Sequence, residues 1–274
     1  GVNGAGRLAM FGKHLTEGYV SLAFATWDVR QGGFAGHMLY SNGSAIGGAL
    51  IQRWQREGLR SILAVTRSAD AISDIGDLNG VQVEISDYTE ATLSALAARL
   101  VSAQTNMARL VVCNGVLQGA CYRPERALAQ IESTAMHQVF EVNTFLPMRI
   151  LSAMAPLLKT SAAPIVAALS ARVGSLGDNR RGGWYSYRGS KAALNMMLQC
   201  LAHELVRVNR SAKIVAYHPG TVDTPLSKPL QAGVRPETLL QPDQAAEALD
   251  AVLSQVVADG TLSYVDWRGQ PIPW

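Results

Sequence analysis

The feature that most constrains the fold is a regular alternation of two kinds of segment from residue 37 onward. Short runs of β-branched and apolar residues, typical of buried strands, are separated by longer segments with apolar residues at helical spacing. This pattern predicts repeated strand–helix–strand units around a parallel sheet. We expect seven strands, at His37–Ser41, Ser61–Thr66, Val81–Ile85, Arg109–Asn114, Pro164–Leu169, Ala212–His218 and Leu262–Val265.

Helical spacing occupies five segments between these strands, at Ile46–Glu57, Glu90–Ala103, Ser133–Leu158, Tyr185–Asn209 and Asp243–Ala258. The chain has 274 residues, 48% of them hydrophobic, which is enough to bury one substantial core. We therefore expect a single α/β domain built on a wound, seven-stranded parallel sheet.

The composition argues against several classes of partner. The formal net charge is only +3 and no run of Lys and Arg reaches five residues, so the charge pattern of a nucleic-acid-binding protein is missing. The scattered histidines form no metal-binding pair, so we expect no structural metal. No apolar run approaches the roughly 20 residues that cross a bilayer, and no signal-type segment is present. We expect a small-molecule partner, no membrane contact and a cytoplasmic location, which suits three cysteines without C-x-x-C spacing.

The first 36 residues do not follow the alternation, and nothing in them indicates a function. We treat residues 1–36 as an N-terminal extension and residues 37–274 as the domain. The run Gly36–Met38 is compatible with a cloning junction, which would make Met38 the natural start, and equally with native sequence. A further hypothesis makes the extension an interaction arm.

Tyr187 and Lys191 stand four residues apart in the run YRGSKAALNMM. On a helix this spacing puts both side chains on one face, whereas Tyr185 points elsewhere. A free tyrosine has a pKa near ~10, and a neighbouring ammonium favours the phenolate and lowers that pKa. The pair is therefore suited to proton transfer near neutral pH. Taken alone, however, the spacing is better explained by an exposed helix face.

The context of the pair resembles the short-chain dehydrogenase/reductase family from Met38 to Trp274. The helix YRGSKAALNMM is similar to the Y-x-x-x-K helix of that family, and HPGTVDT is similar to the Pro-Gly loop after its sixth strand. The run VFEVNTFLPMRIL resembles the helix that carries the catalytic asparagine of the family. The runs SARVGSLGDNRRGGWYSYRGSK and DWRGQPIPW resemble small bacterial members related to the C-factor and sniffer-like carbonyl reductases.

The resemblance implies a Rossmann-type fold and a role for each matching residue. Tyr187 would exchange a proton with a substrate carbonyl or alcohol while a hydride moves to or from a nicotinamide ring. Lys191 would lower the pKa of Tyr187 and bind the nicotinamide ribose hydroxyls. Asn143 would anchor a water that leads protons toward Lys191. Without the family, Asn143 is better explained as satisfying a break in the backbone of its own helix.

The serine that the family uses to bind the substrate oxygen is not in its usual place. The Ser-Ser-x-x-Gly run of the family corresponds here to Ser170-Ala171-Arg172-Val173-Gly174, so Ala171 occupies the position of the serine. Ser170 precedes that position by one residue, and Ser175 follows the glycine. We expect Ser170 to supply the donor, with Ser175 as the alternative. With neither, Tyr187 would act alone, and loss of one such donor typically costs ~100- to 1000-fold in rate.

The cofactor loop also departs from the pattern, because backbone that approaches a pyrophosphate at a helix N-terminus favours glycine. In SNGSAIGGALIQRWQREG, Ser41 and Ala45 take two of the three glycine positions and Gly47, after Ile46, takes the third. Gly43 lies nearby and could supply flexibility. Without the downstream motifs, the loop is better explained as a Gly/Ser turn that caps a helix.

Further matches complete the implied dinucleotide site. Arg67, in AVTRS, lies where the family binds the adenosine ribose, and an arginine there can pair with a 2′-phosphate, which favours NADP over NAD. The alternative is a solvent-exposed arginine at a helix start. The resemblance also assigns cofactor contacts to Glu84, Ile85, Asn114, Gly115, Pro219, Gly220, Val222 and Thr224, with Thr224 bonding the nicotinamide carboxamide.

These features predict an NADP(H)-dependent oxidoreductase that interconverts a carbonyl and an alcohol, with NAD as the other possible cofactor. The rival hypothesis is a dinucleotide-binding sensor or signalling protein with little catalysis, which Ala171 and the glycine-poor loop suggest. The Pro- and Leu-rich segment Asp223–Gln241 is either a lid over an apolar pocket or a surface linker. By analogy, the two long helices Ser133–Leu158 and Tyr185–Asn209 would pair in a homodimer or homotetramer.

Overall fold

A parallel sheet forms the centre of the molecule, and the chain does not visit its strands in sequence order. The computed structural model describes residues 35–40, 44–68 and 79–274. Within these residues seven strands pair in the order β3-β2-β1-β4-β5-β6-β9, and every neighbouring pair is parallel. The strands are β1 (Ala35–Tyr40), β2 (Ile62–Thr66), β3 (Val81–Ile85), β4 (Asn106–Val112), β5 (Ile165–Leu169), β6 (Lys213–His218) and β9 (Leu262–Asp266). The predicted seven-stranded parallel sheet is confirmed.

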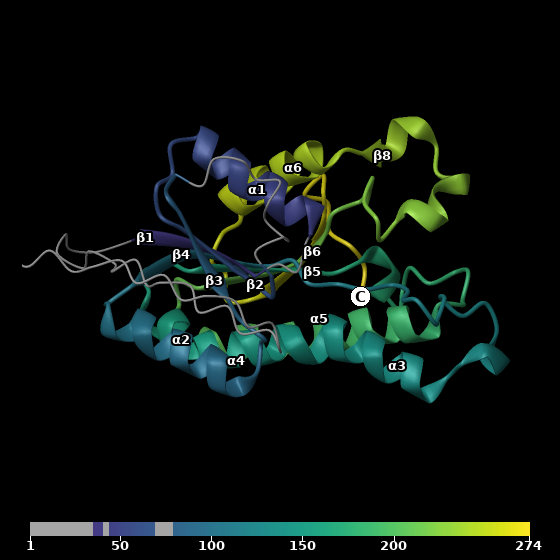
Figure 1. Cartoon of the computed structure of the whole chain (residues 1–274), viewed down its shortest axis with the longest axis horizontal. Helices are drawn as coiled ribbons and strands as arrows, with labels where there is room; N and C mark the ends of the chain where they lie inside the picture. The colour runs from purple at the N-terminus through teal and green to yellow at the C-terminus, as the bar shows by residue number, and fades with distance from the viewer. Residues whose placement is uncertain (1–34, 41–43, 69–78) are drawn as a thin grey trace, which may run out of the picture. The chain divides into compact units, whose positions relative to one another are not determined.

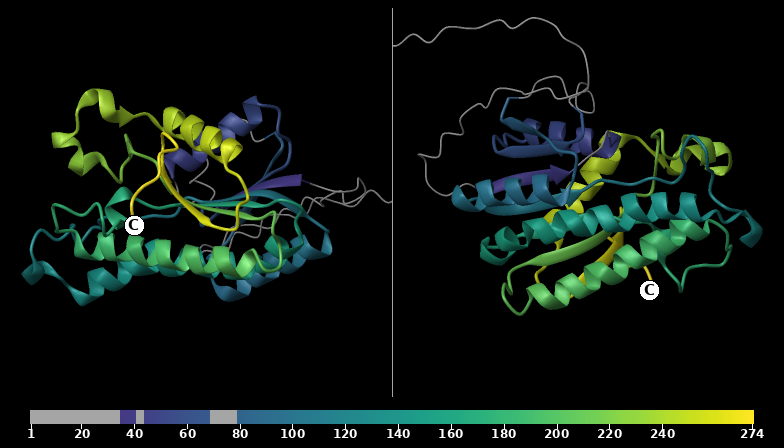
Figure 2. Two further views of the ribbon diagram at one scale, coloured as in Figure 1. Left: turned by 180° about the vertical axis from the view of Figure 1, so that it is seen from behind. Right: turned by 60° about the horizontal axis from the view of Figure 1, so that its bottom comes forward.

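Helices cover both faces of the sheet, as Figure 1 shows. α1 (Ala45–Arg56) and α6 (Pro242–Gln255) lie on one face, and α2 (Glu90–Ser102), α4 (Leu146–Thr160) and α5 (Tyr185–Leu205) lie on the other. α3 (Ser133–Phe140) precedes α4 and packs against α5. The views from behind and from below agree with this layering, and they show α4 and α5 running side by side (Figure 2). The fold is therefore doubly wound and of the Rossmann type, as the sequence predicted.

Burial of the sheet on both faces explains why the strands read as continuous apolar runs. β2 is buried at all five positions, which is typical of a parallel strand covered by helices on each side. The core under α2, α4 and α5 includes Leu96, Leu110, Ile150 and Leu198, and the core under α1 and α6 includes Leu50, Trp54, Val111, Val215 and Leu249. No helix in the described ranges is both long and apolar enough to cross a membrane.

The helix predicted at Ser133–Leu158 is interrupted by one widened turn. α3 ends at Phe140, a π-helical turn spans Glu141–Phe145, and α4 continues to Thr160. A π-turn inserts an extra residue into a helix, which hydrophobic spacing does not reveal, and such turns are frequent at functional sites. The predicted start at Ser133 agrees with the start of α3, and the predicted end at Leu158 lies close to the end of α4. The π-turn between the two helices was not predicted.

Two short strands were also not predicted. β7 (Thr221–Val222) and β8 (Leu239–Leu240) form a small parallel pair apart from the main sheet. They bracket most of the Pro- and Leu-rich segment, which contains 3-10 turns at Lys228–Gly233 and Pro236–Thr238. Strands of two residues lie below what sequence alternation can indicate.

The first strand begins slightly earlier than expected. β1 starts at Ala35 and contains the run Gly36–Met38, which pairs with β2 and β4. Residues 1–34 lie outside the described residues, so the role of the extension stays a prediction.

The strand order reverses at the carboxyl ends of β1 and β4. From β1 the chain builds β2 and β3 to one side, and then crosses to β4 on the other side. In open α/β sheets, ligands bind where the order reverses in this way. The segments after Tyr40 and Val112 are therefore the part of the fold in which a dinucleotide would lie.

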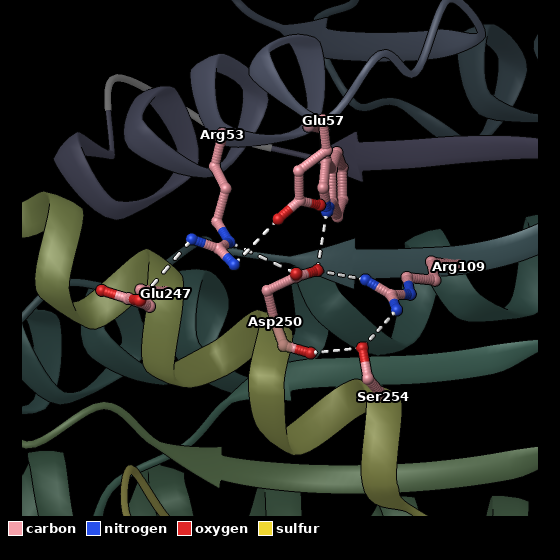
Figure 3. Close-up of polar contacts among 7 residues, drawn as sticks. Arg53, Glu57, Arg109, Glu247, Asp250 and Ser254 are labelled. Atoms are coloured by element: carbon pink, nitrogen blue, oxygen red, sulfur yellow. Dashed lines mark hydrogen bonds and ion pairs between the residues drawn. The ribbon is translucent and has the colours of Figure 1, made fainter.

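A buried carboxylate joins α1, β4 and α6 (Figure 3). Both helices cover the face of the sheet opposite α5 (Figure 1). Asp250 of α6 accepts hydrogen bonds from the indole N–H of Trp54 at 3.0 Å, from the guanidinium of Arg53 at 3.3 Å and from that of Arg109. Arg109 also donates to the hydroxyl of Ser254 at 2.9 Å. Burial alone would raise the pKa of the Asp250 carboxyl, but the bond from Trp54 and the charge of Arg109 lower that pKa below its ordinary value.

Because Arg109 is itself mostly buried, removing the charge of Asp250 leaves a guanidinium without compensation. We predict that Asp250→Asn lowers the free energy of unfolding by about 3–5 kcal/mol, measured by urea denaturation at neutral pH. Glu247→Gln is the matched control, since that carboxylate on the same helix is 68% exposed and lies 3.9 Å from Arg53. The control should change the free energy by less than about 0.5 kcal/mol. Equal urea midpoints for the two variants would contradict the prediction.

Candidate active site

Tyr187 and Lys191 lie in the first two turns of α5, where the helix packs against the ends of β4 and β5. Lys191 is 2% exposed, and its Nζ donates a hydrogen bond to the carbonyl oxygen of Leu169, the last residue of β5, at 2.7 Å. Gly174 allows this close packing, because a Cβ at that position would lie 2.9 Å from the Lys191 Cβ. The lysine is therefore a buried group at the sheet edge and does not belong to an exposed helix face.

Gly115, Asn143 and Lys191 converge on one point after β4. A Cβ built on Gly115 would lie 3.8 Å from both the Asn143 Oδ1 and the Lys191 Nζ. The backbone of Gly115 therefore passes directly beside the amine. The cofactor contact that the resemblance implies for Gly115 stays a prediction.

Asn143 lies in the π-turn and is fully buried. Its Oδ1 accepts from the N–H of Val116 at 2.8 Å, and its Nδ2 donates to the carbonyl of Val116 at 2.8 Å and to the Ser190 hydroxyl at 3.1 Å. The side chain thus joins the segment after β4 to α5. It does not satisfy a break in its own helix, which was the explanation favoured without the family.

The phenol of Tyr187 forms no hydrogen bond with any residue in the described part of the chain. Burial, with a smaller contribution from Tyr264, raises the pKa of Tyr187 to about 12. The Trp184 ring packs edge-on against it, with centroids 6.3 Å apart. The pKa of Tyr187 is thus raised where the resemblance implied that Lys191 lowers it, because burial removes water from the phenolate.

The amine of Lys191 is affected by the same loss of water. Burial lowers the pKa of Lys191 to about 7, far below its ordinary value of 10.5. An amine with a pKa near 7 can be charged or neutral near physiological pH, which is useful in proton exchange. The two groups are therefore tuned mainly by burial.

Neither candidate serine replaces the missing donor directly in this arrangement. The Ser170 hydroxyl donates to the Asn195 Oδ1 at 2.6 Å. The Ser175 hydroxyl donates to the carbonyl of Pro273 and accepts from the N–H of Asp178 at 3.0 Å. Both serines are buried, and Ala171 is 6% exposed between them.

On the cofactor side, Ser41 and Gly43 lie outside the described residues. Ala45, Ile46 and Gly47 form the first turn of α1, and Ser44 caps this turn by accepting the N–H of Gly47 at 3.3 Å. α1 thus begins after the carboxyl end of β1, where the strand order reverses.

Arg67 follows β2 and is exposed, with its guanidinium 5.4 Å from the centre of the Tyr88 ring. Tyr88 is buried, and its hydroxyl donates to the carbonyl of Val65 at 2.9 Å. The ring therefore provides a fixed surface beneath the guanidinium. Glu84 lies nearby at the end of β3 and accepts a bond from Arg99 at 2.6 Å, while Ile85 is 44% exposed.

Asn114 provides an indication of a missing partner. It is 4% exposed, and neither its Oδ1 nor its Nδ2 bonds to any residue that the structure describes. Buried amide groups without partners are rare in native structures. A bound molecule that passes Gly115 could satisfy them, so the residues fit a dinucleotide at this edge.

The loop after β6 carries the last of the implied cofactor residues. Gly220 has φ of +79°, and a Cβ there would lie 2.9 Å from the Trp267 ring, so only glycine fits. Pro219 precedes it, and Val222 is buried in β7 and pairs with Leu240. Thr224 follows in a turn in which its carbonyl accepts from Ser227 and Lys228. These residues lie after the end of β6.

Several residues at the site were not predicted. Ser190 and Asn195 lie on the face of α5 that carries Lys191, and helical spacing from Tyr187 could have found them. Glu125, in the segment between β4 and α3, contacts the start of α5. No local pattern indicates that contact, because it joins segments far apart in the sequence.

The buried amine makes one prediction about stability. The pKa of Lys191 is about 7 in the folded protein, against its ordinary value of 10.5 in the unfolded chain. Between pH 7 and pH 10.5 the unfolded chain therefore binds a proton that the folded chain lacks. The contribution of Lys191 to the free energy of unfolding therefore rises with pH across this range. We predict that Lys191→Met is more stable than wild type at pH 7 by more than about 1.4 kcal/mol, and that the gap narrows toward pH 10.

Urea unfolding at pH 7 and at pH 9.5 measures this gap. Lys159→Met, at a side chain that is 44% exposed, is the control and should differ from wild type equally at both pH values. If the difference in free energy of unfolding between Lys191→Met and wild type does not change with pH, burial does not lower the pKa of the Lys191 amine.

The comparisons with known proteins show the family of the chain. A model of the short chain dehydrogenase family matches residues 39–235. The C-signal protein of Myxococcus xanthus is 34% identical over 148 residues, which cover 54% of this chain and 84% of that protein.

Solved structures show the same fold at lower identity. A short-chain dehydrogenase/reductase from Burkholderia multivorans with bound NADP superposes with a TM-score of 0.73 at 23% identity, covering 88% of this chain and all of that one. The carbonyl reductase Sniffer of D. melanogaster gives a TM-score of 0.74 at 19% identity with the same coverage. With the family model matching most of the domain, the chain belongs to the short-chain dehydrogenase/reductase family.

Proposed function

We propose that the protein interconverts a carbonyl and an alcohol with NADP(H), and that Tyr187 is the general acid and base. The observation that carries the proposal is a phenol with no partner in the described part of the chain, one helical turn from a buried amine beside Gly115. Bound NADP(H) would supply or accept the hydride. The hydroxyl of Tyr187 would donate its proton to the carbonyl oxygen in reduction and remove it from the alcohol in oxidation.

Lys191 and Asn143 would support that proton transfer. The Lys191 Nζ uses one donor on Leu169, so its remaining donors can bind ribose hydroxyls and stabilise negative charge on Tyr187. Asn143 fixes the backbone of Val116 and so the path of Gly115 beside the amine. In this position Asn143 would also anchor a water that leads protons toward Lys191.

We keep Ser170 as the proposed second donor to the substrate oxygen. Ser175 already donates to Pro273 and accepts from Asp178, so both of its roles are used. Ser170 donates only to Asn195, and rotation about one side-chain bond would release that donor. A weak second donor would make the enzyme slow relative to relatives with serine at Ala171.

NADP is the proposed cofactor because Arg67 is exposed after β2 and lies over a fixed aromatic ring. A guanidinium pairs well with a phosphate, and the relative from Burkholderia multivorans has bound NADP. Ser41, Gly43, Ala45, Ile46 and Gly47 would receive the pyrophosphate at the N-terminus of α1. Asn114 would use its unpartnered amide on the same molecule.

We also propose pairing of two copies through α4 and α5. Met196 is 65% exposed and Met197 is 37% exposed on α5, and Phe145 at the start of α4 is 46% exposed. Large apolar side chains on neighbouring helices are typical of a surface that another chain covers.

A second candidate function is a dinucleotide-binding sensor or signalling protein. It is favoured by Ala171 in the donor position and by the relative C-signal. On this alternative the same residues would bind the dinucleotide, and turnover would be absent.

The role of Tyr187 separates the candidates. We predict that Tyr187→Phe lowers kcat by at least ~100-fold for any aldehyde, ketone or quinone that the wild type reduces, because the phenyl ring has no proton to give. The dissociation constant for NADPH, measured by fluorescence titration, should change little. Tyr185→Phe is the matched control, since that ring is 39% exposed two residues away, and its kcat should equal that of wild type.

Unchanged kcat in Tyr187→Phe would rule out the proposed mechanism. NADPH binding by wild type without turnover on the whole panel would favour the sensor. No binding of NADPH or NADH would exclude both candidates.

Cofactor choice depends on Arg67. We predict that Arg67→Ala raises the dissociation constant for NADPH by ~10- to 100-fold and leaves that for NADH within about twofold, because one charge-assisted contact to the 2′-phosphate is lost. Arg60→Ala is the control, as that side chain bonds the carbonyl of Gln55 in another turn. Equal weakening of both cofactors would show that Arg67 does not read the phosphate.

A further inference from the structure

A buried carboxylate from the segment between β4 and α3 contacts the start of α5. Glu125 is 6% exposed, and both of its carboxylate oxygens contact Ser186, the second residue of the helix. The Ser186 hydroxyl donates to Oε1, and the Ser186 N–H donates to Oε2 at 3.3 Å. The carbonyl oxygen of Glu125 accepts the N–H of Trp184 at 2.5 Å. Glu125 thus binds the two residues on either side of Tyr185.

The start of α5 requires such a partner. The first N–H groups of a helix have no acceptor within it, and a Ser, Thr, Asp or Asn at the N-cap commonly supplies one. Trp184 occupies the N-cap position of α5 and provides no side-chain acceptor. Glu125 takes this role from 61 residues away, and its charge is favourable at the positive end of the helix dipole.

The turn that leads into α5 is strained. Gly182, Gly183 and Trp184 have φ of +63°, +64° and +53°, and left-handed backbone costs roughly 1–2 kcal/mol for a residue with a side chain. A Cβ at Gly183 would lie 3.2 Å from the carbonyl oxygen of Glu125, so the two segments pass closely. Strained backbone persists where surrounding contacts determine it, and it clusters at active sites.

Stability alone does not account for the carboxylate. A buried charge loses several kcal/mol of hydration, and among the described residues Glu125 forms no ion pair with Lys or Arg that would offset this loss. A neutral side-chain acceptor, such as the amide of glutamine, could bind the Ser186 N–H without this loss. What the carboxylate provides is direction, because it fixes the backbone of Ser186 immediately before Tyr187, while the backbone carbonyl of Glu125 binds Trp184, whose ring packs against the phenol.

We propose that Glu125 is a positioning residue for Tyr187. By binding Ser186 and Trp184 it sets the direction of the first turn of α5, and so the orientation of the phenol toward the substrate. The inference rests on the proposed role of Tyr187 as acid and base. A displacement of about 1 Å in a reacting group can cost ~100-fold in rate, so the contact matters for kcat more than for cofactor binding.

The test compares Glu125→Ala, Glu125→Gln and Glu132→Gln in the full chain. Glu132 is the matched control, since its carboxylate is exposed in the same surface hollow of about 830 Å³ as Glu125. For E125A we expect kcat to fall ~100-fold, with KM for the carbonyl substrate and the dissociation constant for NADPH within about twofold of wild type. E125Q keeps an acceptor for the Ser186 N–H and should recover kcat to within ~10-fold of wild type. E132Q should match wild type.

A second measurement is independent of turnover. Hydrogen exchange followed by mass spectrometry should show faster exchange at the amides of residues 185–188 in E125A and E125Q, with the rest of α5 unchanged. If E125A does not fold, the same comparison is made with E125Q, which preserves the shape of the side chain.

Wild-type kcat in folded E125A, or unchanged exchange at the start of α5 in a folded Glu125 variant, overturns the proposal. A rise in KM at constant kcat overturns it as well, because it would assign Glu125 to substrate binding. If the wild type shows no turnover, the proposed function fails, while the exchange experiment still decides whether Glu125 fixes the helix start.

Discussion

The burial of one amine between α5 and the sheet is the constraint on which the site depends. A charged group inside a protein loses several kcal/mol of hydration, and for Lys191 one described hydrogen bond, to the carbonyl of Leu169, offsets this loss. Because donor and acceptor come from α5 and β5, the helix cannot slide along the sheet without breaking the bond. Gly174 fixes the same distance sterically. The position of the helix that carries Tyr187 thus depends on a buried amine, and burying that amine is itself unfavourable for stability. Such costs are common at sites that perform chemistry.

The fold could be predicted from sequence because it depends on patterns that repeat along the chain. Strands covered on both faces are apolar at nearly every position, as β2 is, and amphipathic helices between them leave little choice but a parallel sheet. The π-turn at Glu141–Phe145 and the two-residue strands β7 and β8 could not be predicted, because each changes the backbone without changing the hydrophobic pattern. The same distinction applies to the site. Tyr187 and Lys191 are local neighbours on one helix, whereas the contacts of Asn143 with Val116 and of Glu125 with Ser186 form only when distant segments pack.

The pKa of Tyr187 shows where reasoning from residue pairs fails. A lysine one turn away indicates a lowered pKa, yet the pKa of Tyr187 is raised to about 12 and that of Lys191 is lowered to about 7. The spacing of two residues in the sequence indicates the attraction between their charges. It does not indicate that both groups lose water on folding, which opposes the charged form of each. In such a site, ionisation depends on what replaces the lost water. Donors that approach the phenolate and acceptors that approach the ammonium would shift the two pKa values toward each other, so ligand contacts and proton transfer are physically linked.

The arrangement also divides the domain into a stable part and a strained part. Asp250 joins α1, β4 and α6 through three donors, with Arg109 in the middle of β4. The end of the same strand leads to Asn114, whose amide has no partner in the described chain, and to Gly115 beside the amine. β4 thus connects the hydrogen-bonded network of Asp250 to the buried amide of Asn114, which has no hydrogen-bond partner in the described chain. Since unpaired buried groups cost about 1–3 kcal/mol each, the Asp250 network contributes stability that allows the carboxyl edge of the sheet to keep groups free for a ligand.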